Sequence, residues 1–304
     1  MGRKQGPDSA EKLNPNIAST IISVVGARSI PLMPGAAQKA FKLSVDPKAE
    51  VRDFIEVIES DEALSARVLR IANSVFFDRG KATNTIEESV NVIGMNELRC
   101  LLSSTTLSEL FPTSNKARWH LWVNDVSTAL IARSIAQRVL PSKTESAFLG
   151  GLLHDIGKLL LLQRVSSDYG IIMEKVKNEG LDFCAAEEQV FPFDHAEVGH
   201  LIGEKWNFSP ELIGVISSHH KSWKELGAKQ VSVTVIVKAA DIISHALGHG
   251  HPNEWGRLRM KNESLLPEVW EILHIPSSEE KEVLGNYQKV FELEFDLYSG
   301  QKQK

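Results

Sequence analysis

Cysteine is nearly absent from this chain, since only Cys100 and Cys184 occur among 304 residues. Two cysteines without a paired spacing exclude a disulfide-built scaffold and fit a reducing compartment. Long apolar runs are also missing, because His, Asp and Lys interrupt the richest cluster, residues 152–162, which is too short to cross a bilayer. The polar residues 1–12 lack the apolar segment of a secretion signal. We therefore expect a cytoplasmic protein that does not associate with membranes.

An excess of positive charge is missing as well. Lysine and arginine number 34 against 39 aspartate and glutamate residues, which gives a formal net charge of -5. Nucleic-acid binding depends on a cationic surface that contacts phosphates, so this balance argues against it. Basic residues such as Arg67, Arg70 and Arg99 are scattered and indicate solvated helix faces. We do not expect a nucleic acid as a partner.

Helical periodicity dominates what the chain does contain, and strand patterns are nearly absent. The most strand-like run, Val231–Val237, continues into Lys238–His245 with apolar residues at helical spacing, so we predict one helix there. Two prolines predict a turn at residues 30–34. The fold class predicted is all-α. The expected helices cover residues 17–25, 35–43, 51–59, 61–73, 85–93, 97–110, 120–140, 145–164, 168–179, 183–190, 195–206, 209–219, 231–246, 266–273 and 279–297.

These helices group into two main blocks. Residues 1–14 are polar and are predicted to be disordered. Residues 15–113 form an N-terminal helical block whose short links suit a compact bundle. Residues 114–250 form a second helical block, and residues 251–304 form a C-terminal helical extension expected to pack against it. The architecture predicted is therefore a two-part helical bundle.

Ionisable side chains occur inside several of the apolar helices. His154 and Asp155 end the apolar run that begins at Gly150. Burying an ionised aspartate costs several kcal/mol unless a cation or a metal ion pairs with it. An internal hydrogen-bonded pair is the alternative, since a single helical histidine is more often structural than a metal ligand. The same residue types recur in or beside other predicted helices, at His195, His219, His220 and Asp241. This recurrence favours one shared metal site.

Several strings of this sequence resemble the HDOD proteins, the output-domain relatives of the HD phosphohydrolase superfamily. The string Asp61–Ser74 resembles the family's signature, as do residues 30–34 and 89–94. Gly151–Lys158 and Asp194–Gly199, the latter followed by Trp206, resemble the second part of the family. The resemblance covers roughly residues 17–245. It implies an all-helical fold in which residues 114–250 form an HD-type helical subdomain.

The resemblance also implies a set of metal ligands. The central pair of the motif is His154–Asp155, and the closing aspartate is Asp241. The opening histidine of the superfamily falls at Asn124, a weaker donor for a transition metal, and His120 lies one turn earlier on the same helical face as a substitute ligand. The later histidines of the related HD-GYP enzymes correspond to His195, His219 and His220. Residues 221–229 lack the Gly-Tyr-Pro element of cyclic-di-GMP phosphodiesterases, which argues against that activity.

Two functions compete on these grounds. The first is a bacterial signalling output module without catalysis, with a residual metal site and with a signalling partner protein or a small phosphorylated ligand. The resemblance and Asn124 favour it. The alternative is a metal-dependent phosphohydrolase that acts on a nucleotide or phosphodiester.

In the enzyme hypothesis the catalytic residues are Asp155 and Lys158. Asp155 would bridge two divalent ions, such as Fe or Mn, that activate water, and Lys158 would neutralise phosphate charge. His154 and Asp241, with Asn124 or His120, would hold one ion. The other ion would be held by His195, His219 and His220. Because three histidines and one carboxylate complete a site, we expect bound metal even without turnover.

Overall fold

The described residues of the computed structural model form helices joined by turns, and none of them lies in a strand. They are residues 12–26, 30–31, 35–46, 48–74, 76–77, 80, 82–112 and 116–299. The all-α prediction is thereby confirmed. The disorder predicted for residues 1–14 and the turn predicted at 30–34 fall largely outside these ranges. Within them, no helix combines the length and the apolar character needed to span a membrane.

The chain divides into two compact units. The larger unit comprises residues 1–30 and 111–295, and the smaller unit comprises residues 31–110 and 296–304. This division differs from the expected blocks at both ends of the chain. The N-terminal helix α1 (Pro15–Val25) contacts α9 (Ile156–Arg164) and α12 (His195–Lys205), which places it in the larger unit. Residues 251–295 also belong to that unit.

The smaller unit contains short helices with clear start signals. Asp61 and Thr85 precede helices, and their side chains accept hydrogen bonds from the backbone N–H groups of Leu64 and Glu88. Phe54 lies fully buried in this unit. The helices are α2 (Gly35–Val45), α3 (Val51–Glu59), α4 (Glu62–Ala72), α5 (Ile86–Ile93) and α6 (Met95–Leu110).

Arg99 of α6 does not lie on a solvated face, so that interpretation of the sequence was wrong. The residue is 7% exposed. Its guanidinium donates hydrogen bonds to the carbonyl oxygens of Leu43 and Asp46, each at 2.8 Å, and of Ala49 at 3.1 Å. Carbonyl groups at the end of a helix lack partners within that helix, and the five donors of an arginine suit several at once. Arg99 therefore anchors the chain where α2 ends.

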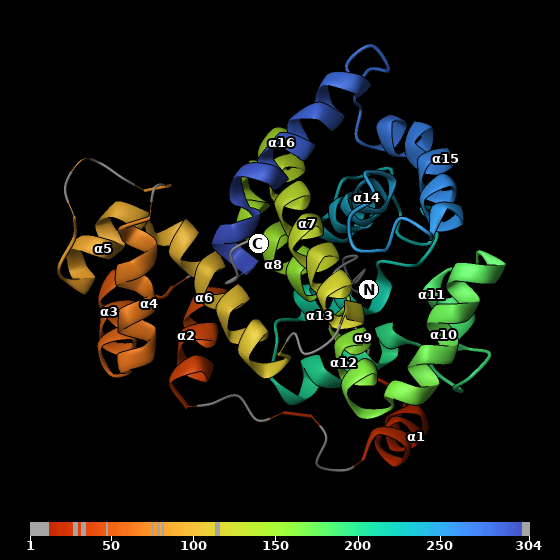
Figure 1. Ribbon diagram of the computed structural model, residues 1–304, viewed down its shortest axis with the longest axis horizontal. Coiled ribbons are helices and arrows are strands. Elements are labelled where there is room, and N and C mark those ends of the chain that lie inside the picture. The colour runs from red at the N-terminus through yellow and green to blue at the C-terminus, as the bar shows by residue number, and fades with distance from the viewer. Residues whose placement is uncertain are drawn as a thin grey trace, which may run out of the picture. The chain divides into compact units, whose positions relative to one another are not determined.

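The larger unit is built around α7 (Lys116–Val139), α8 (Thr144–Leu153) and α14 (Val233–Ala246), which pack against one another (Figure 1). Gly151 permits the close approach of α8 to α7, because a Cβ atom there would lie 2.7 Å from Ala129 Cα. The remaining elements are η1 (Pro141–Lys143), α10 (Ser166–Glu179), α11 (Phe183–Glu187), α13 (Pro210–Ser218), α15 (Gly256–Ile272) and residues 280–295 of α16 (Glu280–Ser299).

The single helix predicted over residues 145–164 is wrong at one point. His154 and Asp155 form a turn that separates α8 from α9. In a continuous helix the two side chains would point about 100° apart. The turn lets both side chains face the interior of the same unit, which the apolar periodicity on either side does not reveal.

Gly157, two residues after this turn, brings α9 against the start of α12. A Cβ atom at this position would lie 1.9 Å from the backbone oxygen of His195 and 3.0 Å from the backbone nitrogen of Gly199. Both neighbours are backbone atoms, so no side chain can rotate to make room. The absence of a side chain at Gly157 therefore sets the distance between the two helices.

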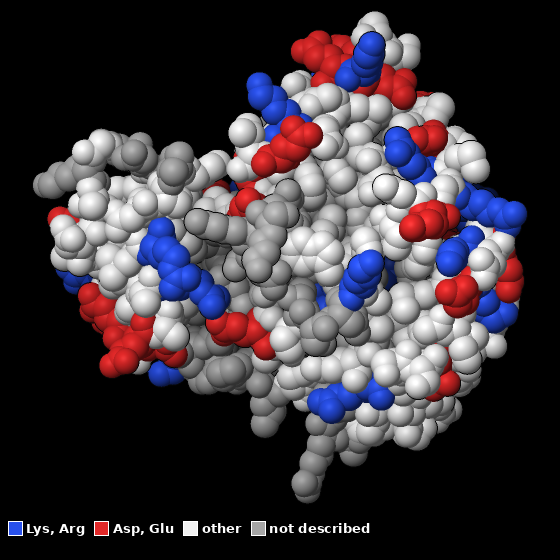
Figure 2. Space-filling model, viewed as in Figure 1, with Lys and Arg blue, Asp and Glu red and all other residues white. Residues whose placement is uncertain are grey.

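Charged side chains are interspersed on the face shown in Figure 2, with Lys and Arg beside Asp and Glu. Ion pairs join Arg67 to Glu109 and Arg259 to Glu263. Among the described residues of that face, no extended patch of positive charge is visible.

We predict that Gly157→Ala lowers the free energy of unfolding by about 1–3 kcal/mol, because the added methyl group forces α9 and α12 apart. Gly170→Ala within α10 is the matched control, since a Cβ atom there meets nothing within 4 Å. It should leave stability unchanged or raise it by up to about 1 kcal/mol. Chemical denaturation of both variants measures the difference. Equal stabilities would contradict the close contact.

Candidate metal centre

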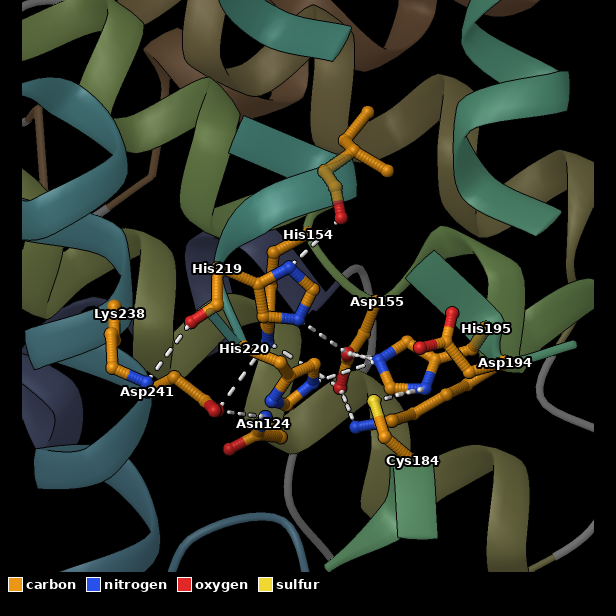
Figure 3. Close-up of polar contacts among 12 residues, drawn as sticks. Asn124, His154, Asp155, Cys184, Asp194, His195, His219, His220, Lys238 and Asp241 are labelled. Atoms are coloured by element: carbon orange, nitrogen blue, oxygen red, sulfur yellow. Dashed lines mark hydrogen bonds and ion pairs between the residues drawn. The ribbon is translucent and has the colours of Figure 1, made fainter. Parts of the chain in front are cut away.

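Four potential metal ligands converge in the larger unit at the turn between α8 and α9. Asp155, His195, His219 and His220 each offer a nitrogen or oxygen atom, and these atoms all lie within 4.8 Å of one another. Figure 3 shows the four side chains grouped together. Asp155 follows α8, His195 is the first residue of α12, and the two adjacent histidines follow α13. The ends of three helices therefore supply the set.

The distances between these ligands are short. Asp155 Oδ1 lies 3.2 Å from His195 Nε2 and 3.5 Å from His219 Nε2. His195 Nε2 lies 2.9 Å from His220 Nε2. Three imidazoles and one carboxylate form a donor set typical of divalent transition metals.

Helix ends orient two of the imidazoles in this region. His154 and His219 are the C-cap residues of α8 and α13. The His154 Nδ1 atom lies 2.7 Å from the Gly151 carbonyl oxygen, and His219 Nδ1 lies 2.9 Å from that of Ile216. Because the last carbonyls of a helix have no intrahelical partner, each helix can hold the Nδ1–H group of its own C-cap histidine. Nε2 is then the nitrogen left for a metal ion.

Glu187, which the sequence analysis missed, orients His195. Its Oε2 atom lies 2.6 Å from His195 Nδ1 and accepts the backbone N–H of His195 at 2.8 Å. The Tyr169 hydroxyl donates to Glu187 Oε1 at 3.3 Å. A carboxylate that binds the second nitrogen of a histidine is a common support for a metal ligand. Nothing in the sequence separates the buried Glu187 from the exposed Glu188 beside it.

Three buried atoms at this centre have no hydrogen-bond partner among the described residues: Asp155 Oδ1, His154 Nε2 and His219 Nε2. Buried polar atoms are nearly always paired, so these need an explanation. A divalent cation can accept lone pairs from a carboxylate oxygen and from imidazole nitrogens together. The residues present therefore fit a divalent metal ion.

Carboxylates dominate the electrostatics of the centre. Although burial favours the neutral ring, the carboxylates of Asp155 and Asp241 raise the pKa of His154 to about 9. Burial also opposes the charge on His195, but Glu187 raises the pKa of this histidine well above its ordinary value. Protons on these two rings thus balance the carboxylates in the metal-free protein. A bound cation would displace such protons.

The two adjacent histidines behave differently. Burial lowers the pKa of His219 to about 4. Burial, together with His219 and His195, also lowers the pKa of His220 well below its ordinary value. Both rings are therefore neutral at physiological pH, which is the form that binds a metal ion.

Lys158 is held inside the protein against Asp155. Its Nζ atom donates to Asp155 Oδ2 at 2.5 Å and lies 4.2 Å from the ring centroid of Phe183. Burial opposes the charge, yet the Asp155 carboxylate raises the pKa of Lys158 above its ordinary value. The ammonium group therefore neutralises one oxygen of Asp155 and leaves the other facing the histidines.

Asp241 of α14 lies beside the four ligands, together with Asn124 of α7 (Figure 3). Asp241 Oδ1 lies 3.4 Å from His154 Nε2 and accepts a hydrogen bond from Asn124 Nδ2 at 3.0 Å. The Ser244 hydroxyl donates to Asn124 Oδ1 at 2.8 Å. The amide oxygen that we considered as a weak ligand is therefore already hydrogen-bonded, and the amide nitrogen faces Asp241.

His120, the proposed substitute for Asn124, has charged neighbours other than the four ligands. It is half-buried near the start of α7. Burial, His251 and Lys116 lower the pKa of His120, while Glu254 opposes them. Its neighbours are thus other residues than the predicted ligands.

Asp125 is a second residue that the sequence analysis missed. It is fully buried, and neither carboxylate oxygen has a hydrogen-bond partner among the described residues. Burial raises the pKa of Asp125 to about 7. Its carboxylate lies within 4.8 Å of donor atoms of His154 and Asp155. The reasoning that identified Asp241, a carboxylate inside an apolar helix, applies equally to Asp125.

Known proteins resemble this chain over most of its length. An HDOD domain protein of unknown function from Geobacter sulfurreducens has a TM-score of 0.68 at 23% identity, covering 91% of this chain and 97% of that one. A provisionally assigned phosphohydrolase from Shewanella amazonensis SB2B has a TM-score of 0.66 at 22% identity, covering 97% of this chain and 98% of that one. At these identities the likeness establishes the fold.

Sequence relatives cover the chain less evenly. An uncharacterized protein from Treponema pallidum (strain Nichols) is 23% identical over 192 residues, which are 63% of this chain and 37% of that protein. The chain thus spans little more than a third of this curated relative. The model of the HDOD domain matches residues 30–222, well over half of the chain. On this match and on the all-helical fold with its His–Asp centre, the chain belongs to the HDOD family.

Proposed function

We propose that this protein is a signalling output module whose larger unit carries a divalent metal centre and does not turn over a substrate. The ligands would be Asp155, His195, His219 and His220. The strongest support is that buried atoms without hydrogen-bond partners, among them Asp155 Oδ1 and His219 Nε2, lie close together. The rings of His195 and His219 are held through Nδ1, which leaves Nε2 for an ion. Fe²⁺ and Mn²⁺ suit such a mixed nitrogen and oxygen set.

The burial of the centre favours a role without turnover. His154, Asp155, His195 and His219 are each at most 1% exposed. Lys158, the cation we expected to face a phosphate group, is bonded to Asp155. A phosphate would need direct access to the ion, and of the four ligands only His220 is half-buried rather than buried. A centre of this kind suits a structural or regulatory ion.

Each residue would have a definite part in such a centre. Asp155 would bind through Oδ1 while Lys158 neutralises Oδ2, and Glu187 would hold the ring of His195 in position. A divalent ion supplies positive charge and Lewis acidity at the point where it binds. Because its ligands come from the ends of α8, α12 and α13, it would stabilise their arrangement. A signalling partner protein or a small phosphorylated ligand would then recognise that arrangement.

A metal-dependent phosphohydrolase is the second candidate, and the position of Lys238 favours it. Lys238 is half-buried, with Nζ 3.3 Å from the carbonyl oxygen of His219 and 4.9 Å from the ring centroid of Trp223. Figure 3 shows it on the Asp241 side of the centre. There an ammonium group would neutralise the charge of an approaching phosphate. The name of the Shewanella relative agrees with this candidate.

We expect the protein, purified without chelator, to retain divalent metal, and His195→Ala to abolish that retention because a ligand is lost. Elemental analysis of dialysed protein measures it. His200→Ala is the matched control, since His200 lies on the same helix and pairs with Glu204 instead. Wild-type protein without metal, even after incubation with Mn²⁺ or Fe²⁺, would reject the centre.

We predict that Glu187→Gln weakens metal affinity by about 10- to 100-fold, because the support of the His195 ring is reduced. Glu188→Gln changes the exposed neighbour on the same short segment and should leave affinity unchanged. Titration with Mn²⁺ after removal of metal measures both constants. An unchanged affinity in Glu187→Gln would show that this carboxylate has no part in metal binding.

We expect the metal-loaded protein to hydrolyse none of a broad panel of nucleotides, phosphomonoesters and phosphodiesters. The reason is the enclosure of the centre by buried side chains. Phosphate release and product chromatography in the presence of Mn²⁺ or Fe²⁺ measure the reaction. Metal-dependent turnover that Asp155→Asn eliminates would replace the module with the phosphohydrolase, while leaving the metal centre in place.

A further inference from the structure

The loop that joins the two adjacent histidines to α14, residues 221–232, supplies none of the proposed metal ligands. It contains three lysines and one glutamate, whereas the formal net charge of the whole chain is -5. Lys221, Lys224 and Lys229 are exposed. None of the three forms an ion pair in the described part of the chain, although Glu225 lies near Lys221. The loop therefore presents positive charge to solvent on an otherwise acidic protein.

Hydrogen bonds fix the shape of this loop. The hydroxyl and the backbone N–H of Ser222 donate to Glu225 Oε2 at 2.6 and 2.9 Å, and the N–H of Ala228 donates to the Trp223 carbonyl oxygen at 3.0 Å. The Trp223 ring packs against the apolar core of the larger unit, with its centroid 4.9 Å from Lys238 Nζ. A loop fixed in advance loses little conformational entropy when a partner binds.

The same loop forms part of the wall of a cavity in the larger unit. The volume of the cavity is about 340 Å³, which is enough for an apolar side chain and its neighbours. Lys143 and Glu211 also line it, and they form an ion pair of 2.7 Å in which their side chains are 42% and 23% exposed. The apolar part of the lining consists of Leu140, Leu226, Val231 and Val233.

We propose that this cavity and the lysines of the loop bind an acidic peptide segment of a partner protein, with one apolar side chain of the segment in the cavity. The inference rests on the proposed signalling role, for which it names the chemistry of the partner. Lys224 and Lys229 lie on either side of Leu226 in the sequence, so they carry positive charge on both sides of a lining residue. Apolar anchors that fill pockets supply most of the affinity of such interfaces, and charge complementarity supplies selectivity and association rate.

A nucleic acid is the less favoured occupant of this surface. Its phosphates would contact the lysines, but its bases stack on exposed aromatic rings. Trp223 is half-buried, and its ring packs against the core and faces Lys238. The cavity itself is lined by aliphatic side chains, which suit the leucine or phenylalanine of a peptide better than a base.

The test is the fluorescence anisotropy of a short labelled peptide, one leucine between glutamate residues, titrated with the full-length protein. We expect binding that weakens as ionic strength rises, because the lysines are exposed to solvent. Two comparison peptides, one with lysine in place of glutamate and one with serine in place of leucine, should bind at least about tenfold more weakly. Equal affinity for the serine peptide would overturn the role of the cavity.

Lys224→Glu should weaken binding of the glutamate–leucine peptide by about three- to tenfold, because an attractive charge becomes repulsive. Lys42→Glu is the matched control, since it makes the same change of charge at an exposed lysine of the smaller unit and should leave affinity unchanged. Leu226→Ser should weaken binding through the cavity, so its effect should persist at high ionic strength. An affinity that neither Lys224→Glu nor Leu226→Ser alters would contradict the proposed surface.

The remaining outcomes separate this inference from the proposed function. A wild type that retains metal but does not bind the peptide would overturn the docking surface and leave the metal centre in place. Peptide binding by a wild type without metal would support the surface and reject the centre. Binding of a single-stranded oligonucleotide in place of the peptide, or self-association that Lys224→Glu abolishes in sedimentation experiments, would assign the surface to a nucleic acid or to a second copy of the chain instead.

Discussion

The negative charge of Asp155 is the constraint on which the centre of this protein depends. The residue is 1% exposed, and its pKa is held well below the ordinary value by His154 and Lys158 against the effect of burial. Such a charge is tolerated inside a protein only when every side of it is compensated. Lys158 compensates one oxygen, and His195 and His219 face the other. The ends of α8, α12 and α13 meet here because the buried charge of Asp155 requires this compensation.

In this centre one hydrogen bond at a helix end both satisfies a carbonyl group and orients a histidine ring. The last carbonyls of α8 and α13 need hydrogen-bond donors, and the histidines that follow these helices need an oriented ring. In each helix, the contact between the histidine Nδ1 atom and a carbonyl oxygen of the last turn meets both needs. Gly157 completes the arrangement, because only a residue without a side chain lets α9 approach the backbone of His195.

The sequence predicted candidate ligands best where an ionisable residue interrupts an otherwise apolar helix. The all-α class followed from periodicity, and the predicted ligands followed from ionisable residues in apolar helices; the structure groups Asp155 with His195, His219 and His220. Glu187 could not be predicted, because its burial depends on tertiary contacts that Glu188, of the same type, does not make. The turn at His154 was hidden because helical periodicity continues on both sides of it. Arg99 was misinterpreted because its carbonyl partners are fifty or more residues distant in sequence.

Glu187 binds His195 twice, once through the ring and once through the backbone N–H. These two contacts fix the orientation of the ring without the help of a bound ion. What must leave is the proton that the carboxylate attracts to the imidazole. Because a proton and a cation compete for this ring, the affinity of the centre for a divalent cation would rise as the medium becomes more alkaline.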